Sequence, residues 1–292
     1  MNREMGAELF FKCENFQKTG SFKARGATHA VLALSDVQAA RGVATHSSGN
    51  HAAALARAAA IRGVPAYIVM PSGSSAFKVR RTEAYGATIT FCEPTHAARE
   101  AACKRILEET GAALVHPFTD ERVMAGQGTA AVELMNEIVD LDAIMCPVGG
   151  GGLLAGTAVA AKAVRPLIRV IAAEPLGADD AARSFAAGRL LSNSHPATIA
   201  DGLRANLGEP NFEILRKYVD AVITVQESSI IAAMRLIWET MKIVIEPSAA
   251  VPLAALLERN VPDAANSRIG IILTGGNVDL DNLPWMERSA PR

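Results

Sequence analysis

Residues 147–156, Pro-Val-Gly-Gly-Gly-Gly-Leu-Leu-Ala-Gly, are the stretch that decides the fold of this chain. An apolar segment that begins at Ala143 precedes them, and an Ala-rich helical segment follows. Consecutive glycines between a strand and a helix leave backbone N–H groups open at the helix N-terminus, where a phosphate can bind. The stretch has neither the lysine of a P-loop nor the glycine spacing of a dinucleotide-binding fold. It predicts an α/β protein with a phosphate cradle, the alternative being a flexible turn or close packing.

Strand-like and helical segments alternate on both sides of this loop, which is typical of parallel sheets covered by helices. Glycine and proline near 41–42 and 116–117 mark two crossing points between lobes. The sequence therefore predicts a larger domain from 1–41 and 119–292 and a smaller one from 42–118. The predicted strands are 8–13, 42–45, 66–70, 88–91, 143–148, 167–173, 221–225 and 269–273, and the clearest predicted helices are 50–62, 96–110, 125–139, 153–164 and 228–242.

The composition excludes several classes of protein. The 292 residues are 50% apolar, and 29 basic residues nearly balance 30 acidic ones, so a sizeable core is expected and disorder is not. Nothing in this charge balance indicates a nucleic-acid or anionic-membrane surface. The four cysteines form no C-x-x-C pair, and no signal peptide or long apolar run is visible. We expect a cytoplasmic protein without a zinc site, nucleic-acid partner or membrane partner.

A second motif is Lys18-Thr19-Gly20-Ser21-Phe22-Lys23-Ala24-Arg25-Gly26-Ala27, a polar loop that runs into a helix. A lysine at a helix start is most often a solvated surface charge. Near a phosphate cradle, however, a lysine with a nucleophilic amine can form a Schiff base with a phosphorylated aldehyde. Lys23 is the candidate for this role.

Two further loops follow predicted strands. The segment Thr45-His46-Ser47-Ser48-Gly49-Asn50-His51 opens a helix, where Ser48 or Asn50 could simply be the N-cap. The same N–H groups can bind a substrate carboxylate, and the Asn50 amide can donate to a phenolic oxygen. Thr274, before Gly275-Gly276, falls at the carboxyl end of the last strand, where ligands of open parallel sheets bind.

Acidic side chains follow another strand at Glu174 and Asp180, with backbone carbonyls between them. Oxygen ligands of this kind suit Mg²⁺, Ca²⁺ or Mn²⁺. A solvated acidic loop is the alternative that these residues alone favour.

Together these motifs resemble the fold-type II pyridoxal-phosphate enzymes, within them the serine/threonine dehydratase and serine racemase group. The resemblance extends over nearly the whole chain and rests on K-T-G-S-F-K-A-R-G-A, S-S-G-N-H, P-V-G-G-G-G-L-L-A-G and T-G-G-N-V-D. It implies two parallel-sheet lobes of the tryptophan synthase β type, with pyridoxal 5′-phosphate in the cleft between them. It also implies a homodimer.

The resemblance assigns roles to individual residues. It implies that Lys23 holds the cofactor covalently, that Asn50 binds the ring 3′-oxygen and that Thr274 faces the pyridine nitrogen. Ser48 matches the serine that racemase-like members carry opposite the lysine, so Lys23 and Ser48 are the expected catalytic residues. The cofactor-binding set is Phe22, Lys23, Asn50, Gly149, Gly150, Gly151, Gly152, Leu153 and Thr274, the substrate-binding set is Ser47, Ser48, Gly49, Asn50 and His51, and the cation ligands are Glu174, the Ala178 carbonyl and Asp180.

The activity implied is dehydration of L-serine, L-threonine or a related β-hydroxy amino acid followed by hydrolysis, which takes the water back up and yields a 2-oxo acid and ammonia. Serine racemisation is a candidate second activity. The alternatives are a threo-3-hydroxyaspartate dehydratase and a catalytically silent cofactor-binding homologue. The silent homologue is considered because members of the family begin earlier, before the strand that here contains Leu9. β-Replacement as in cysteine synthase is a weaker alternative, because its lysine motif resembles S-V-K-D-R.

Overall fold

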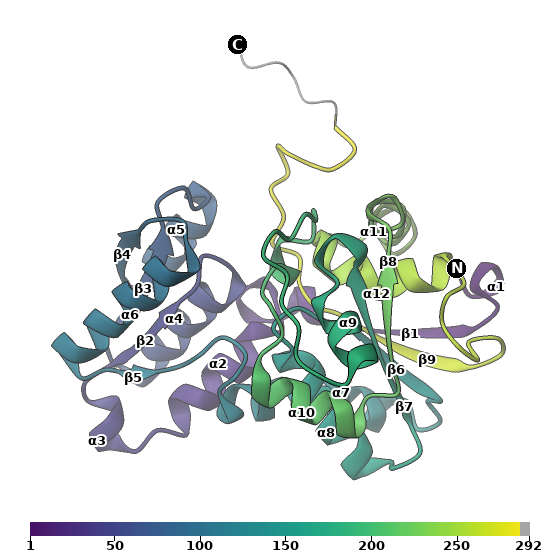
Figure 1. The fold of residues 1–292 in the computed structure, drawn as a ribbon, viewed down its shortest axis with the longest axis horizontal. Helices are drawn as coiled ribbons and strands as arrows, with labels where there is room; N and C mark the ends of the chain where they lie inside the picture. The colour runs from purple at the N-terminus through teal and green to yellow at the C-terminus, as the bar shows by residue number, and fades with distance from the viewer. Residues whose placement is uncertain (287–292) are drawn as a thin grey trace.

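In the computed structural model, which describes residues 1–286, the chain forms two parallel β-sheets that lie in two lobes side by side (Figure 1). The order in the larger sheet is β1-β9-β6-β7-β8 and in the smaller sheet β4-β3-β2-β5. The larger sheet contains β1 (Glu8–Cys13), β6 (Ala143–Pro147), β7 (Arg169–Pro175), β8 (Ala221–Val225) and β9 (Arg268–Leu273). The smaller contains β2 (Val43–His46), β3 (Ala66–Pro71), β4 (Thr88–Cys92) and β5 (Ala113–Leu114).

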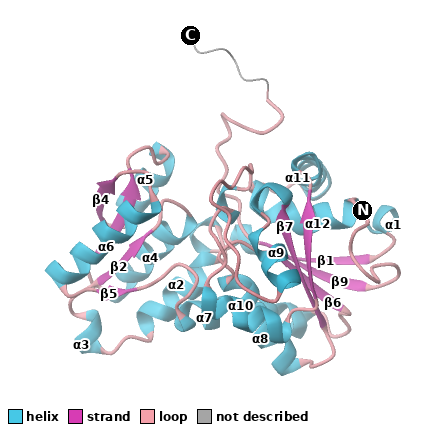
Figure 2. Ribbon diagram, in the orientation of Figure 1, coloured by secondary structure: helices cyan, strands magenta, loops and turns pink. Residues whose placement is uncertain are grey.

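Helices cover both sheets, as Figure 2 shows. They are α1 (Asn2–Met5), α2 (Lys23–Leu32), α3 (Asp36–Ala39), α4 (Asn50–Arg62), α5 (Ala76–Glu83), α6 (His96–Thr110), α7 (Glu121–Glu137), α8 (Gly152–Val164), α9 (Asp180–Ala187), α10 (Glu209–Tyr218), α11 (Glu227–Met241) and α12 (Pro247–Leu257). The predicted α/β architecture with two parallel sheets is therefore confirmed.

The larger sheet is buried on both faces. Successive residues of a strand point to opposite faces, and in β6 Met145 packs with α11 and α12 while Ile144 packs with α7, α8 and α10. Both side chains are fully buried. This two-sided burial explains why the strands of this sheet read as continuous apolar runs instead of alternating ones.

Several elements lie outside the predicted ranges, and for two of them the sequence gives a physical reason. The first is α12, whose residues 247–256 are all buried and which contains Pro252. A helix that is apolar all round has no amphipathic period, and an internal proline argues against a helix, so the sequence gives little signal. The second is β5, which has two residues and is too short to show a period.

Helix α2 connects the lobes. Ala27, Ala30 and Val31 lie in the core of the smaller lobe with α4, while the other side of α2 packs on α7. At that crossing a Cβ on Gly26 would lie 2.6 Å from the Val123 carbonyl oxygen, so the backbones touch. The larger sheet takes its strands from 8–13 and 143–273 and the smaller from 43–114, and α2 packs into the smaller lobe although it precedes residue 42. The domain boundaries stay a prediction.

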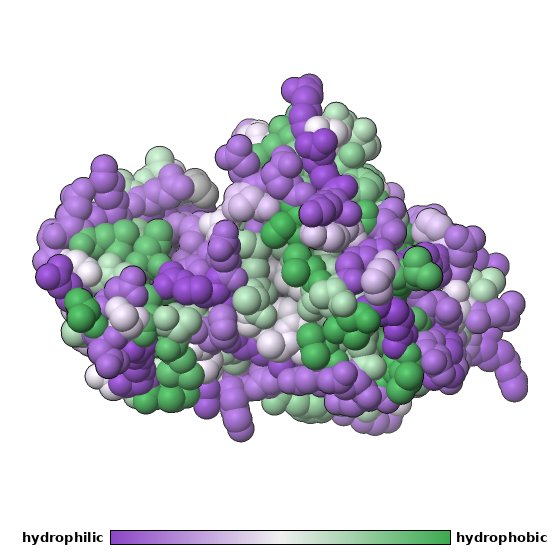
Figure 3. All heavy atoms as spheres, turned by 90° about the horizontal axis from the view of Figure 1, so that it is seen from below, coloured by the Kyte–Doolittle hydropathy of each residue, from purple (hydrophilic) through white to green (hydrophobic). Residues whose placement is uncertain are grey.

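The exterior carries mixed polar and apolar side chains, with hydrophilic residues along most of the edge of the face seen in Figure 3. Within residues 1–286, none of the helices combines the length and the hydropathy that crossing a bilayer requires.

Candidate active site

Lys23 is the first residue of α2 and lies where α2 meets the segment that follows β5. Its Nζ donates a hydrogen bond to the Pro117 carbonyl at 2.7 Å, and the Phe22 ring centroid lies 5.1 Å from the same nitrogen. Burial lowers the pKa of the Lys23 amine to about 8, although the Glu246 carboxylate opposes the shift. A sizeable share of these amines is neutral at pH 8, which makes Lys23 suited to act as a nucleophile or a base.

The loop after β9 is tied directly to the loop before Lys23. The Phe22 N–H donates to the Thr274 carbonyl at 2.9 Å, and the Gly276 N–H donates to the Gly20 carbonyl at 3.0 Å. Thr274 is 2% exposed, and the buried Ser21 hydroxyl has no hydrogen-bond partner within the described chain. The structure therefore brings Thr274 close to Lys23 and leaves a buried hydroxyl beside them for a polar ligand.

The glycine loop joins β6 to α8. Gly151 has φ +91°, a conformation that favours glycine, and α8 begins at Gly152. The first N–H groups of a helix have no acceptor within it, so this end can bind an anion. A Cβ on Gly150 would lie 2.4 Å from the Phe118 ring, and one on Gly149 would lie 2.9 Å from Leu203. Close packing and phosphate binding are therefore compatible in this loop. The glycines permit the close packing, and the N–H groups at the start of α8 stay available for a phosphate.

Phe118 is a site residue that sequence reasoning missed. Its ring lies against Gly150, and the carbonyl of the preceding residue, Pro117, accepts from Lys23. The Asn211 side chain donates to both the Phe118 and Gly150 carbonyls, which joins the two loops. The segment with Pro117 and Phe118 therefore contacts both Lys23 and the glycine loop. No sequence pattern predicted this role.

The loop 47–51 lies between β2 and α4. Its N-cap is Gly49, with no side-chain cap, and the Gly49 N–H donates to the Ser47 hydroxyl at 3.3 Å. Ser48 is half-buried and does not cap the helix. Capping by Ser48 is therefore not observed, and N–H groups at the start of α4 remain available for a substrate carboxylate.

Asn50 is held by Glu246, which sequence reasoning also missed. The Asn50 Nδ2 lies 2.9 Å from Glu246 Oε1 and 3.2 Å from Oε2. Burial raises the pKa of Glu246 to about 7, and Asp201 adds to the shift. The two residues are 196 apart in the chain, so no local motif connects them.

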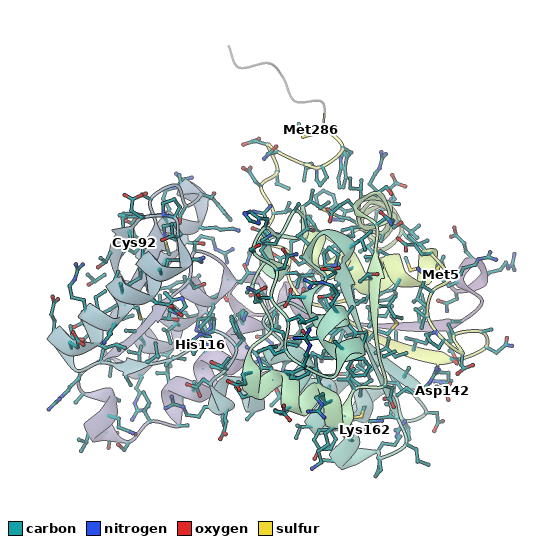
Figure 4. The ribbon with its side chains drawn as sticks, viewed as in Figure 1. Met5, Cys92, His116, Asp142, Lys162 and Met286 are labelled. Carbon is teal, nitrogen blue, oxygen red and sulfur yellow. The ribbon has the colours of Figure 1, made fainter. Side chains whose placement is uncertain are left out.

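His51 and two other histidines lie together inside the smaller lobe. The His51 Nε2 bonds the Val115 carbonyl at 3.1 Å, and burial together with Lys23 lowers the His51 pKa to about 3, so the ring is neutral. The His46 and His116 rings pack edge to face at 5.4 Å, and Figure 4 shows His116 toward the centre of the molecule. The His51 Nε2 is thus engaged within the lobe, whereas its buried Nδ1 has no hydrogen-bond partner among the described residues, and a role of His51 with substrate stays a prediction.

The side chains of Glu174, near the end of β7, and Asp180, at the start of α9, are buried, not solvated. Glu174 Oε1 accepts from the Ala182 N–H at 2.6 Å, and Asp180 Oδ2 accepts from the Leu207 N–H at 2.8 Å. Burial raises the pKa of Glu174 to about 9 and also raises that of Asp180. Ala178 lies between them and is 1% exposed. Buried carboxylates whose partners are backbone N–H groups are suited to bind a cation. Leu207 also packs against Gly151 and so connects these carboxylates to the glycine loop.

The comparisons with known proteins agree with this geometry. A family model described as "Pyridoxal-phosphate dependent enzyme" matches residues 1–275. The chain is 50% identical over 286 residues to a β-hydroxyaspartate dehydratase of Paracoccus denitrificans, covering 98% of this chain and 90% of the relative. It is 51% identical to a serine racemase of Arabidopsis thaliana, covering 97% and 87%. The structure of maize serine racemase superposes with a TM-score of 0.94 at 48% identity, covering 96% of this chain and 86% of that one.

Proposed function

Because the chain belongs to the pyridoxal-phosphate dependent enzymes, in the group of serine racemases, threonine deaminases and hydroxyaspartate dehydratases, we propose that it dehydrates a β-hydroxy amino acid, after which hydrolysis takes the water back up and releases ammonia. The products are a 2-oxo acid and ammonia, and the candidate substrates are serine, threonine and threo-3-hydroxyaspartate. The observation that carries the proposal is the buried Lys23 amine, which lies beside the glycine loop and close to Thr274.

The residues present fit pyridoxal phosphate. When bound, the cofactor would supply the electron sink for the reaction. Lys23 Nζ would hold it and then take the proton from the substrate Cα, while the N–H groups of 149–152 would bind its phosphate. The N–H groups at the start of α4 would bind the substrate carboxylate. Thr274 offers a neutral hydroxyl to the ring nitrogen, so no carboxylate there holds a proton on it.

Serine racemisation is the second candidate function, and Ser48 is the residue that favours it. Its side chain is half-buried on the loop that opens α4, and its hydroxyl is not used as a helix cap. A hydroxyl in this loop can return a proton to the substrate Cα from the face opposite Lys23. The same site would then catalyse both elimination and racemisation.

The test of the main proposal is 2-oxo acid release from L-serine, L-threonine and L-threo-3-hydroxyaspartate by purified protein supplied with pyridoxal phosphate. Release from at least one of them without an added thiol supports the dehydratase, and the preferred substrate names the activity. A bound-cofactor absorption band without turnover would instead identify a silent cofactor-binding homologue. Turnover only with an added thiol would indicate β-replacement.

We further propose that Glu174, the Ala178 carbonyl and Asp180 bind Mg²⁺, Ca²⁺ or Mn²⁺. The support is the burial of both carboxylates and the contact from Leu207 to the glycine loop. No group of three or more His, Cys, Asp or Glu side chains suited to a metal occurs among residues 1–286, so a backbone oxygen is needed here.

We expect a saturating divalent cation to stabilise the protein, because a ligand at 100 times its Kd adds about 2.7 kcal/mol. The midpoint of thermal unfolding should rise by several degrees and fall again when EDTA is added. Glu174→Gln should remove the response, while Asp179→Asn should keep it, because Asp179 pairs with Arg183 instead. Equal responses in both variants would contradict the site.

Glu246 should make the stability of the cofactor-free protein depend on pH. Its folded pKa of about 7 lies above its ordinary value of 4.5, so in this window the folded chain holds a proton that the unfolded chain has lost. The free energy of unfolding therefore falls as pH rises from 4.5 through 7, by about 3 kcal/mol. Urea unfolding of wild type and Glu246→Gln at pH 4.5, 6 and 8 measures this. Parallel pH curves for the two proteins would contradict the prediction.

We also propose a cytoplasmic homodimer. The four cysteines are all free thiols, which suits a reducing compartment, and the family resemblance supports the dimer.

A further inference from the structure

Helix α5 belongs to the smaller lobe, and two of its side chains reach the larger lobe. Lys78 Nζ pairs with the Asp201 carboxylate, and Arg81 Nη1 donates to the Asn277 side-chain oxygen. Figure 1 shows α5 on the flank of its lobe that faces the other lobe. Lys78, Arg81 and Asn277 line a small hollow together with Asn50 at the start of α4, so these side chains converge at the junction of the two lobes.

Both polar atoms of the Asn277 side chain, Oδ1 and Nδ2, form hydrogen bonds. Its Nδ2 donates to Asn50 Oδ1 and to the Thr19 carbonyl, both at 2.8 Å, while its Oδ1 accepts from Arg81. Turning the amide over would place Oδ1 against two oxygens and Nδ2 against a guanidinium. Arg81 therefore selects the orientation in which Asn277 donates to Asn50.

Asn50 is consequently fixed from two directions. Its Oδ1 accepts from Asn277, and its Nδ2 donates to the Glu246 carboxylate. The Nδ2 contacts both Glu246 oxygens, at 2.9 and 3.2 Å, and an amide nitrogen carries two hydrogens, so an added acceptor can take the place of the longer contact. Under the proposed function this acceptor is the phenolic oxygen of the cofactor.

We propose that Arg81 is a positioning residue of the active site, which acts through Asn277 across the junction of the two lobes to aim the Asn50 amide. The proposal rests on the proposed function, because it takes from it the role of Asn50. The Phe77 ring supports the guanidinium at 5.4 Å. Lys78 differs from Arg81, because its pair with Asp201 joins the lobes and does not include Asn277.

The test compares Arg81→Ala, Arg81→Lys and Arg80→Ala as holoenzymes. Arg80 is the control, since it is the exposed neighbour on the same helix. Loss of a charge-assisted contact should lower kcat roughly tenfold to hundredfold in Arg81→Ala, with partial rescue by Arg81→Lys. It should also shift the visible band of the bound cofactor, which reports the contact to its phenolic oxygen. Arg80→Ala should change neither.

A double-mutant cycle with Asn277→Ala shows whether Arg81 acts through Asn277. If it does, adding Arg81→Ala to Asn277→Ala changes kcat and the band by less than twofold. An undiminished effect in that background overturns the proposal, as does an unchanged band in Arg81→Ala when wild type is active. If wild type binds the cofactor but turns over no substrate, a band that shifts in Arg81→Ala and not in Arg80→Ala supports the positioning role while the proposed function fails.

Discussion

Lys23→Ala should lose at least 10²–10⁴-fold in 2-oxo acid release, since a positioned acid–base group contributes about that much and the covalent attachment is lost as well. The reason lies in the surroundings of the amine. Burial lowers its pKa to about 8, and its contact with the Pro117 carbonyl places it beside the glycine loop. The measurement is steady-state release from the best substrate, together with the visible absorption of the cofactor after dialysis. Both should be lost.

Lys18→Ala is the matched control. Lys18 lies on the same loop but is exposed, and the contact seen there, to the Gln17 side chain, involves its backbone N–H. This variant should keep its cofactor band and its turnover. If Lys23→Ala retained turnover above a tenth of wild type, another base would have to take the substrate proton, and the assignment of Lys23 would be wrong.

The motifs that the sequence predicts are those whose functional residues lie next to one another along the chain. Lys23, the 149–152 glycines and Thr274 each lie in a short motif, and the family resemblance that these motifs carry implied that they meet at one site. The fold could be predicted as well, because apolar runs mark buried parallel strands. Capping at Ser48 was an open alternative that only the backbone at Gly49 could decide.

The parts that were missed join residues that are distant in the chain. Glu246 reaches Asn50, and Arg81 reaches Asn277, in each case across 196 residues. A buried glutamate and a helical arginine have no pattern that separates them from an ordinary ion pair or a solvated charge. Phe118 was missed for the same reason, because only the folded structure shows that its ring packs against Gly150. One sequence predicts which local segments fold, but not which loops meet.

Ser48→Ala should separate the two activities. Lys23 Nζ takes the Cα proton of an L-amino acid, so elimination from L-serine should persist at a reduced rate. The D-enantiomer needs a group on the other face, so D-serine turnover and racemisation should fall by roughly 10²-fold or more. Chiral chromatography of serine after incubation, together with 2-oxo acid release from each enantiomer, gives the two rates.

Two variants sharpen this result. Ser48→Thr keeps a hydroxyl at the same position and should retain part of the racemisation. Ser47→Ala removes the hydroxyl that accepts from the Gly49 N–H, so it should change KM for both enantiomers without changing their ratio. If D-serine turnover in Ser48→Ala equalled that of wild type, Ser48 could not be the proton donor. If both enantiomers lost activity equally, Ser48 would serve substrate binding, because a proton donor for one face cannot affect the two faces alike.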